Sequence, residues 1–139
     1  MTTEQLEQIE ELARRAVACK RWRWMPGMRT SEGWRVIRGS TESGCWAYDE
    51  NPENWQVADN RIEDGTLPDL TDPATLGCLL ALVREAWGPT ASVSVNLSGF
   101  WAVGGATVLK GKGKGSSINL GIWKATEIDA LVSALEVAP

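Results

Sequence analysis

Apolar residues spaced three to four positions apart predict a helix at the start of the chain, within Met1–Ala18. The positions that share this face are Leu6, Ile9, Leu12, Ala13, Ala16 and Val17. Thr2 and Gln5 have the spacing of a capping box, in which two side chains satisfy backbone groups of the first turn. The opposite face is charged, so we expect a surface helix with one apolar stripe to bury.

A second apolar segment lies at the centre of the chain, between clear start and stop signals. Asp72 is a favoured N-cap, Pro73 occupies the first helical position, and Gly88-Pro89 is a stop signal. Between these signals only Arg84 and Glu85 are charged. A helix that is apolar almost all round is buried against a sheet or against a second copy of itself. Because one short chain buries such a helix only with difficulty, we interpret the pattern as an indication of a dimer.

Shorter segments with strand-like patterns flank this central helix. Gly33–Arg38 and Gly44–Asp49 are joined by a polar connection and predict a hairpin. The acidic stretch from Asn51 to Leu70 is expected to be mostly loop, with a short strand near Trp55–Ala58. After the central helix we expect a turn at Gly104-Gly105 and strands at Ser92–Leu97, Phe100–Val103, Thr107–Leu109 and Ile118–Trp123.

A third helix completes the predicted order of elements. Thr126 caps an amphipathic segment whose apolar positions are Ile128, Leu131, Val132 and Leu135. The order is helix, hairpin, helix, antiparallel meander, helix, which is typical of the α+β class. We expect a single domain over residues 1–139. In it the N-terminal, central buried and C-terminal helices pack on one antiparallel sheet, and the chain forms an oligomer.

The composition narrows the chemistry that the protein can perform. The chain has no histidine, so the commonest general base and the commonest transition-metal ligand are missing. No motif frames a lysine as the base for a serine nucleophile, and the carboxylates between Asp49 and Asp72 are typical of solvated loops. We therefore expect a ligand-holding protein rather than an enzyme, with no catalytic residue, no metal and no cofactor.

The cysteines and the hydropathy of the chain indicate its compartment. Cys19, Cys45 and Cys78 are far apart, and reduced buried thiols are expected. No apolar run approaches the roughly 20 residues of a membrane-spanning helix, and the acidic N-terminus is unlike a signal peptide. We expect a cytoplasmic protein with no membrane partner.

Charges of opposite sign are segregated along the chain, which has 18 acidic and 14 basic residues. Lys20–Arg38 and Lys110–Gly115 are basic, whereas Glu42–Asp72 is acidic. The overall acidity argues against binding to duplex nucleic acid, which depends on a broad basic surface. It is compatible with a small anionic ligand in a local basic pocket, and also with a basic patch on one copy meeting an acidic patch on another.

Arginine and tryptophan alternate between Lys20 and Arg29, where guanidinium groups can neutralise phosphate and indoles can stack on a flat ring. The candidate ligand-binding residues in this stretch are Arg21, Trp22, Arg23, Trp24, Met25 and Arg29. The same alternation also fits a half-buried strand, because tryptophan is mostly core material. The sequence alone leaves both interpretations open.

A second candidate for contact with an anion is the Lys-Gly alternation near residue 112. Lys110, Lys112 and Lys114 fit either a mobile hairpin tip or a flexible lid that closes over a phosphate. Trp101 and Trp123 belong to the neighbouring predicted strands. Either indole fits a stacking face for the ligand or the core.

A third candidate is Lys124, which lies just before the N-cap Thr126. There a cation and free backbone N–H groups would attract an anion together. Glu127 in the first turn opposes an anion, which weakens this candidate.

Three motifs resemble a group of short proteins encoded by bacteriophages. They are Trp24-Met25-Pro26-Gly27-Met28, the segment DPATLGCLLALVREAWG from Asp72 to Gly88, and Thr126-Glu127 followed by Ala130-Leu131-Val132 and Ala134-Leu135. The group is similar to the Thoeris anti-defence sponge proteins, which sequester cyclic nucleotide signals made by bacterial immune enzymes without degrading them. Glu32–Leu70 and Ala91–Trp123 follow no pattern that aligns with the group.

The resemblance implies a homo-oligomer with ligand pockets between subunits, acting in the infected bacterial cell. The implied ligands are glycocyclic ADP-ribose or small cyclic oligonucleotides. On this leading hypothesis the arginines of the Lys20–Arg29 stretch neutralise phosphates and Trp22, Trp24 or Trp101 stacks on adenine. The lysines of the Lys-Gly alternation, or Lys124, close the site.

Two other hypotheses remain open at this point. The alternative function is a protein-binding inhibitor that masks a host defence factor through the acidic surface of Glu42–Asp72. The third is an enzyme that hydrolyses the same cyclic signals through a carboxylate-bound metal. A sponge returns its ligand intact after denaturation, an inhibitor captures a host protein, and an enzyme returns a product.

Overall fold

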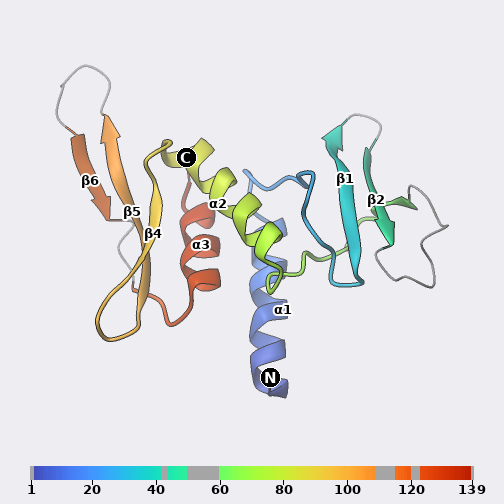
Figure 1. Ribbon diagram of the computed structural model, residues 1–139, viewed down its shortest axis with the longest axis horizontal. Coiled ribbons are helices and arrows are strands. Elements are labelled where there is room, and N and C mark those ends of the chain that lie inside the picture. The colour runs from blue at the N-terminus through green and yellow to red at the C-terminus, as the bar shows by residue number, and fades with distance from the viewer. Residues whose placement is uncertain (1, 42–43, 50–59, 109–114, 120–122, 139) are drawn as a thin grey trace. The chain divides into compact units, whose positions relative to one another are not determined.

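The computed structural model describes residues 2–41, 44–49, 60–108, 115–119 and 123–138 (Figure 1). The chain divides into two compact units. Unit 1 comprises Met1–Ala18 and Trp22–Cys78, and unit 2 comprises Cys19–Arg21 and Leu79–Pro139. Three helices and two three-stranded antiparallel sheets occur within the described residues, which confirms the predicted α+β class and order of elements.

The strands form two sheets, one in each unit, where the sequence analysis expected one shared sheet. The central helix and the acidic loop before it separate the two groups of strands along the chain. Each group therefore pairs with its own sequence neighbours. The expectation of one domain over residues 1–139 stays a prediction.

In unit 1, α1 (Thr3–Val17) begins at the predicted capping box. The Gln5 amide donates to the Thr2 hydroxyl at 3.2 Å, and the Thr2 amide donates to the Gln5 side chain at 2.9 Å. The buried residues of the helix are Leu12, Ala13 and Ala16. Leu6 on the same face is 53% exposed, so the apolar stripe is covered mainly toward its C-terminal end.

The sheet of unit 1 has the order β1 (Trp34–Thr41), β2 (Gly44–Asp49) and β3 (Asn60–Arg61). The first two strands form the predicted hairpin, in which Val36 pairs with Ala47 and both are buried. β3 then pairs with β2 through Arg61 opposite Trp46. The strand expected near Trp55–Ala58 lies outside the described residues.

The segment between α1 and β1 folds back onto the start of β1. Gly27 has a φ of 97°, which glycine adopts without strain, and this confirms the turn predicted at Pro26-Gly27. The Gly27 amide donates to the Val36 carbonyl at 2.9 Å, and the Val36 amide donates to the Met28 carbonyl at 2.8 Å. Met28 is fully buried, so this turn fixes the end of the segment that carries Trp22–Trp24.

The central helix α2 (Pro73–Trp87) begins in unit 1 and continues in unit 2. Asp72 caps it as predicted, because its carboxylate accepts the Thr75 amide at 3.0 Å. Gly88, with a φ of 122°, ends it. The buried residues of α2 are Thr75, Leu79, Leu82 and Val83. Burial of this helix is thus confirmed in part, whereas its packing on a second copy stays a prediction.

The sheet of unit 2 has the order β4 (Ser92–Val95), β5 (Trp101–Val108) and β6 (Gly115–Asn119), all antiparallel. The turn expected at Gly104-Gly105 is wrong, because both glycines lie within β5 and Gly104 pairs with Ser92 and with Asn119. Without a Cβ, glycine is as compatible with a strand that has neighbours on both sides as with a turn. The chain turns earlier, at Gly99, which has a φ of 83°.

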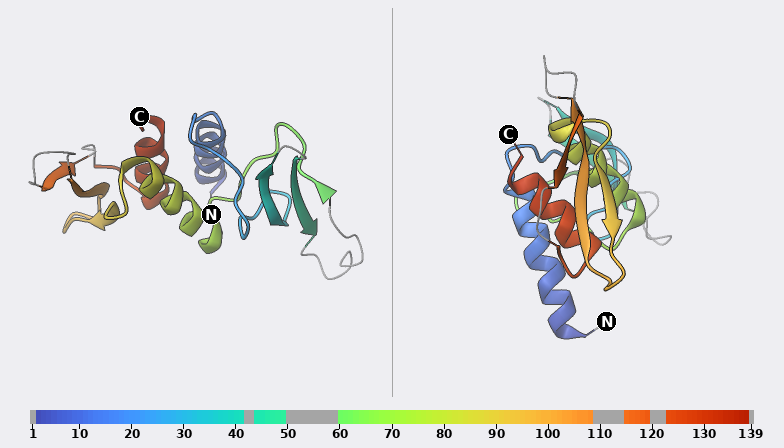
Figure 2. Two further views of the ribbon diagram at one scale, coloured as in Figure 1. Left: turned by 90° about the horizontal axis from the view of Figure 1, so that it is seen from above. Right: turned by 90° about the vertical axis from the view of Figure 1, so that its left-hand side faces the viewer.

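The last helix, α3 (Glu127–Glu136), packs alongside β5 and β4 in unit 2, as Figures 1 and 2 show. Its predicted cap is present, since the Asp129 amide donates to the Thr126 hydroxyl at 3.1 Å. The buried residues of α3 are Ala130, Leu131, Val132, Ala134 and Leu135. The indole N–H of Trp87 donates to the Ala134 carbonyl at 2.9 Å and joins the end of α2 to α3.

Candidate functional site

One cavity of unit 1 brings together several of the predicted ligand-binding residues. It is lined by residues 22–24, by Gly44 and Cys45 at the start of β2, by residues 61–66 and by Val17. Its volume of about 420 Å³ lies within the range of small-molecule sites. We call this cavity the tryptophan pocket.

Trp22 and Trp24 form one part of the pocket wall. Their ring centroids are 5.5 Å apart and the ring planes meet at 79°, an edge-to-face arrangement that holds both indoles in place. Both indoles are half-buried, whereas Arg23 between them is exposed. Residues 22–25 belong to no strand, so the alternative of a half-buried strand is wrong for this segment.

Arg61 is a pocket residue that the sequence analysis missed. It lies on β3 and lines the same cavity as Arg23. An ideal Cβ at position 44 would lie 2.6 Å from Nε of Arg61, so this guanidinium occupies the space that the absent side chain of Gly44 leaves. Gly44 also has a φ of 111°, which disfavours any other residue there. The one signal in the sequence was a single arginine within an acidic stretch.

The charges around the tryptophan pocket balance. Arg23 and Arg61 are its cations, and Glu63 and Asp64 are its anions. All four side chains are exposed, so solvent screens their mutual attraction. The pocket therefore suits a ligand that carries both negative charge and hydrogen-bond donors better than it suits a simple anion.

The thiol of Cys45 also lines the tryptophan pocket. Burial raises the pKa of this thiol to about 11, although a backbone hydrogen bond with Trp46 lowers it slightly. The thiol is therefore protonated at neutral pH. Because the thiolate is the reactive form, Cys45 is a poor nucleophile and acts as a small apolar wall residue.

Met25 and Arg29, which were also predicted to contact the ligand, do not line this pocket. The Met25 amide donates to Sδ of Met28 at 3.3 Å, and the side chain is half-buried. The Arg29 guanidinium donates to Asp69 at 2.6 Å. Arg29 therefore stabilises the loop before α2, and its charge is compensated within the protein.

The other predicted site residues are not among those that line the tryptophan pocket. Arg21 is exposed and belongs to unit 2. In the same unit Trp101 and Lys124 pair through their backbones, with amide-to-carbonyl distances of 2.6 and 2.7 Å. Lys110, Lys112 and Lys114 lie outside the described residues.

The start of α3 is a poor anion site. Lys124 is half-buried, but Glu127 and Asp129 both lie in the first turn. The Asp129 amide is already bonded to Thr126. Negative charge at a helix N-terminus competes with an anionic ligand for the positive end of the helix dipole.

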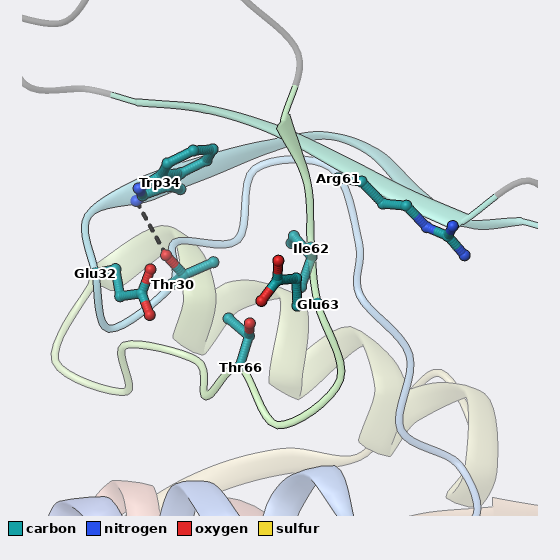
Figure 3. Close-up of a pocket in the computed structure, with 7 residues that line it drawn as sticks. All are labelled: Thr30, Glu32, Trp34, Arg61, Ile62, Glu63 and Thr66. Atoms are coloured by element: carbon teal, nitrogen blue, oxygen red, sulfur yellow. Dashed lines mark hydrogen bonds between the residues drawn. The ribbon is translucent and has the colours of Figure 1, made fainter. Parts of the chain in front are cut away.

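Two further hollows in unit 1 are less suited to an anion. Figure 3 shows the first, in which Glu32 and Glu63 approach from opposite sides while Arg61 points away from the other residues drawn. This glutamate pocket has a volume of about 220 Å³. The second hollow, of about 600 Å³, lies between α1 and residues 67–71, and its charged residues are Glu10 and Asp69. The glutamate pocket has two glutamates against one arginine, Arg61, and the lining of the second hollow includes no lysine or arginine. Excess negative charge repels phosphate, so the tryptophan pocket, with two arginines and two indoles, is the better candidate.

Residues of the motifs Trp24–Met28 and Asp72–Gly88 contribute to the scaffold of unit 1. Arg35 donates to the Gly27 carbonyl at 2.8 Å and to the Asp72 carboxylate at 2.7 Å. The Arg29 amide donates to the Thr75 hydroxyl at 2.9 Å. Burial raises the pKa of Asp72, but the hydrogen bonds from Arg35 and Thr75 outweigh it and leave that pKa below its usual value. The motifs therefore join the turn at Gly27 to the start of α2.

Part of the acidic stretch is also internal structure. Asp69 and Asp72 are paired with arginines of the same unit, and their side chains are only 15% and 12% exposed. These two carboxylates contribute little to an acidic surface that could mask a host factor. Residues 50–59 of the stretch lie outside the described residues, so that alternative stays a prediction.

Comparisons with known proteins add no evidence about this site. No family model, no curated protein and no solved structure matches the chain. Among the described residues, no group of three or more cysteine, aspartate or glutamate side chains is arranged to hold a metal ion. In the same part of the chain, no helix is long and apolar enough to cross a membrane.

Proposed function

We propose that this protein binds a small anionic cyclic nucleotide in the tryptophan pocket and sequesters it without cleaving it. The observation that carries the proposal is that two indoles and two guanidinium groups line one cavity of about 420 Å³. Indoles stack on any base, and arginines bind phosphate oxygens through paired hydrogen bonds. The resemblance of three motifs to short phage proteins supports a more specific proposal. The protein would then be a sponge for immune signals in the cytoplasm of an infected cell, and its ligand would be glycocyclic ADP-ribose or a cyclic oligonucleotide.

Sequestration rather than turnover is supported by the groups around the pocket. The chain has no histidine, and the Cys45 thiol stays protonated at neutral pH. Glu63 and Asp64 are the carboxylates of the cavity, and both are exposed. These groups favour tight binding over catalysis. Charge-assisted hydrogen bonds combined with stacking can give a nanomolar dissociation constant, which is a binding free energy of roughly 12 kcal/mol.

The test is depletion followed by release. Purified protein is mixed with cyclic di- and trinucleotides and glycocyclic ADP-ribose isomers, filtered away, and heated, and the released compounds are assayed. We expect one compound to be depleted and then recovered intact. Recovery of an altered product would overturn sequestration. No depletion of any compound, together with capture of a host protein, would favour the inhibitor.

A pair of charge-reversal variants ties the result to the pocket. Arg23→Glu removes a pocket cation and is expected to weaken binding at least tenfold, because a charge-assisted contact is worth about 1.5–3 kcal/mol. Lys20→Glu makes the same change of charge at an exposed neighbouring position that does not line the pocket. It is expected to change affinity only slightly. Equal losses in both variants would mean that net charge, and not the pocket, attracts the ligand.

A further inference from the structure

Two carboxylates line the tryptophan pocket, where they repel the phosphate that the arginines attract, and Asp64 is the one that lines no other described pocket. We infer that the pocket selects guanine over adenine, with Asp64 accepting hydrogen bonds from the base. The inference rests on the proposed function, since it names the base of the nucleotide held there. It narrows the ligand from glycocyclic ADP-ribose, whose base is adenine, to cyclic oligonucleotides that contain guanine.

The turn that carries Asp64 fixes its position at the pocket. Asp64 and Gly65 are the two central residues of a four-residue turn, which the Thr66 amide closes by donating to the Glu63 carbonyl at 3.2 Å. Gly65 has a φ of 89°, as the third residue of a type II turn requires. Asp64 is exposed, and in the described part of the chain no ion pair occupies its carboxylate.

Glu63 is the neighbouring carboxylate, and it lines both the tryptophan pocket and the glutamate pocket. Figure 3 shows its side chain in the glutamate pocket, on the side opposite Glu32 and near Thr66. Asp64 lines the tryptophan pocket and not the glutamate pocket. Asp64 is therefore the carboxylate that lines the tryptophan pocket alone, and we assign the contact with the base to it.

The hydrogen-bonding edges of the two purines decide the preference. Guanine presents two adjacent donors, N1–H and N2–H, and a carboxylate has only acceptors, so the two groups form two parallel hydrogen bonds. Adenine presents one donor beside the acceptor N1, which faces a carboxylate oxygen without a shared hydrogen. Stacking on Trp22 or Trp24 favours neither base strongly, so the edge contact sets the selectivity.

The experiment compares cyclic di-GMP with cyclic di-AMP, two ligands that differ only in their bases, by calorimetric titration. The wild-type protein is expected to bind cyclic di-GMP at least tenfold more tightly, as a charge-assisted hydrogen bond predicts. Asp64→Asn replaces one acceptor by a donor, and an amide suits adenine, which offers one donor and one acceptor. This variant is expected to lose at least tenfold of the preference for guanine. Glu32→Gln makes a comparable change at an exposed position that lines the glutamate pocket and not the tryptophan pocket, and it is expected to keep the preference.

The outcomes separate this inference from the proposed function. If neither dinucleotide binds, nor any other cyclic nucleotide of the depletion panel, the proposed function is overturned as well. If both bind with equal affinity, or cyclic di-AMP binds more tightly, the pocket holds nucleotides but Asp64 does not select guanine. A preference that survives in Asp64→Asn, or that is lost equally in Glu32→Gln, would also overturn the assignment to Asp64. Circular dichroism of both variants checks that these exposed substitutions leave the fold intact.

Discussion

At the scale of single residues, the absence of a side chain at Gly44 leaves the space that the Arg61 side chain needs. An ideal Cβ at residue 44 would lie 2.6 Å from Nε of Arg61, so a side chain at this position would clash with the guanidinium. Arg61 lines both the tryptophan pocket and the glutamate pocket, and its side chain points away from the other residues drawn in Figure 3. The candidate site thus depends on a residue that contributes no functional group.

Gly44→Ala is expected to displace Arg61 and weaken ligand binding several-fold. It also strains a backbone with a φ of 111°, which costs about 1–2 kcal/mol in the free energy of unfolding. Gly99→Ala is the control, because Gly99 has a φ of 83°, has no atom within 4 Å of an added Cβ, and lies outside the pocket. Urea denaturation should show a similar loss of stability for both variants, whereas titration should show weaker binding only for Gly44→Ala. Equal binding by the two variants would contradict the placement of Arg61.

At the scale of elements, the start of α2 is the clearest link between sequence motif and structure. The Asp72 carboxylate caps the helix through the Thr75 amide and pairs with the Arg35 guanidinium at 2.7 Å. The Arg35 and Asp72 side chains are only 20% and 12% exposed. Loss of the charge on Asp72 would leave Arg35 without its partner in a place that solvent reaches poorly.

Asp72→Asn is expected to lower the free energy of unfolding by about 2 kcal/mol at pH 7. The folded protein holds the pKa of Asp72 below its usual value, so the stabilising charge is fully present above that value and is lost as pH falls through the folded pKa. The wild type should therefore lose stability more steeply than the variant as the pH falls below the ordinary aspartate pKa of about 3.9. Urea denaturation at several pH values measures both effects. Asp64→Asn, at an exposed position, is the control and should change stability by less than about 0.5 kcal/mol.

Local signals in the sequence were sufficient for the helices and the first hairpin. Thr2, Asp72 and Thr126 each act as the predicted N-cap, because capping depends on residues a few positions apart. The Gly104-Gly105 turn was wrong because glycine permits both turns and strands, and pairing with β4 and β6 decided the outcome. Leu97 was assigned to a strand but is fully exposed at the turn before β5, where hydrogen bonds from Ser98 and Phe100 to the Asn96 side chain fix the chain.

The candidate site was predictable only where its residues are neighbours in the sequence. Trp22, Arg23 and Trp24 form a visible pattern, and the structure places all three at one cavity. Arg61 and Asp64 reach the same cavity through the pairing of β3 with β2 and through the turn that follows. Such long-range pairing leaves no periodic signal, so a lone arginine among acidic residues gave no reason to choose it.

At the scale of the whole molecule, the tryptophan pocket is lined entirely by residues of unit 1. The resemblance to sponge proteins implied pockets between subunits, whereas this cavity is formed within one chain. The proposed binding therefore does not require an oligomer, and the expected homo-oligomer stays a prediction. Unit 2 carries Trp101 and Lys124, whose backbones pair with each other. It has no assigned part in the proposed binding.

The most direct test of the central claim observes the tryptophans themselves. The chain has eight tryptophans, and each indole N–H gives a separate signal in a nitrogen-15 correlation spectrum. Single Trp→Phe variants assign the signals of Trp22 and Trp24, and cyclic di-GMP is then added to the wild-type protein. The account predicts that these two signals shift most, in proportion to occupancy, while that of Trp87 in unit 2 stays in place. Shifts confined to other indoles, or no shift with any cyclic nucleotide of the panel, would contradict it.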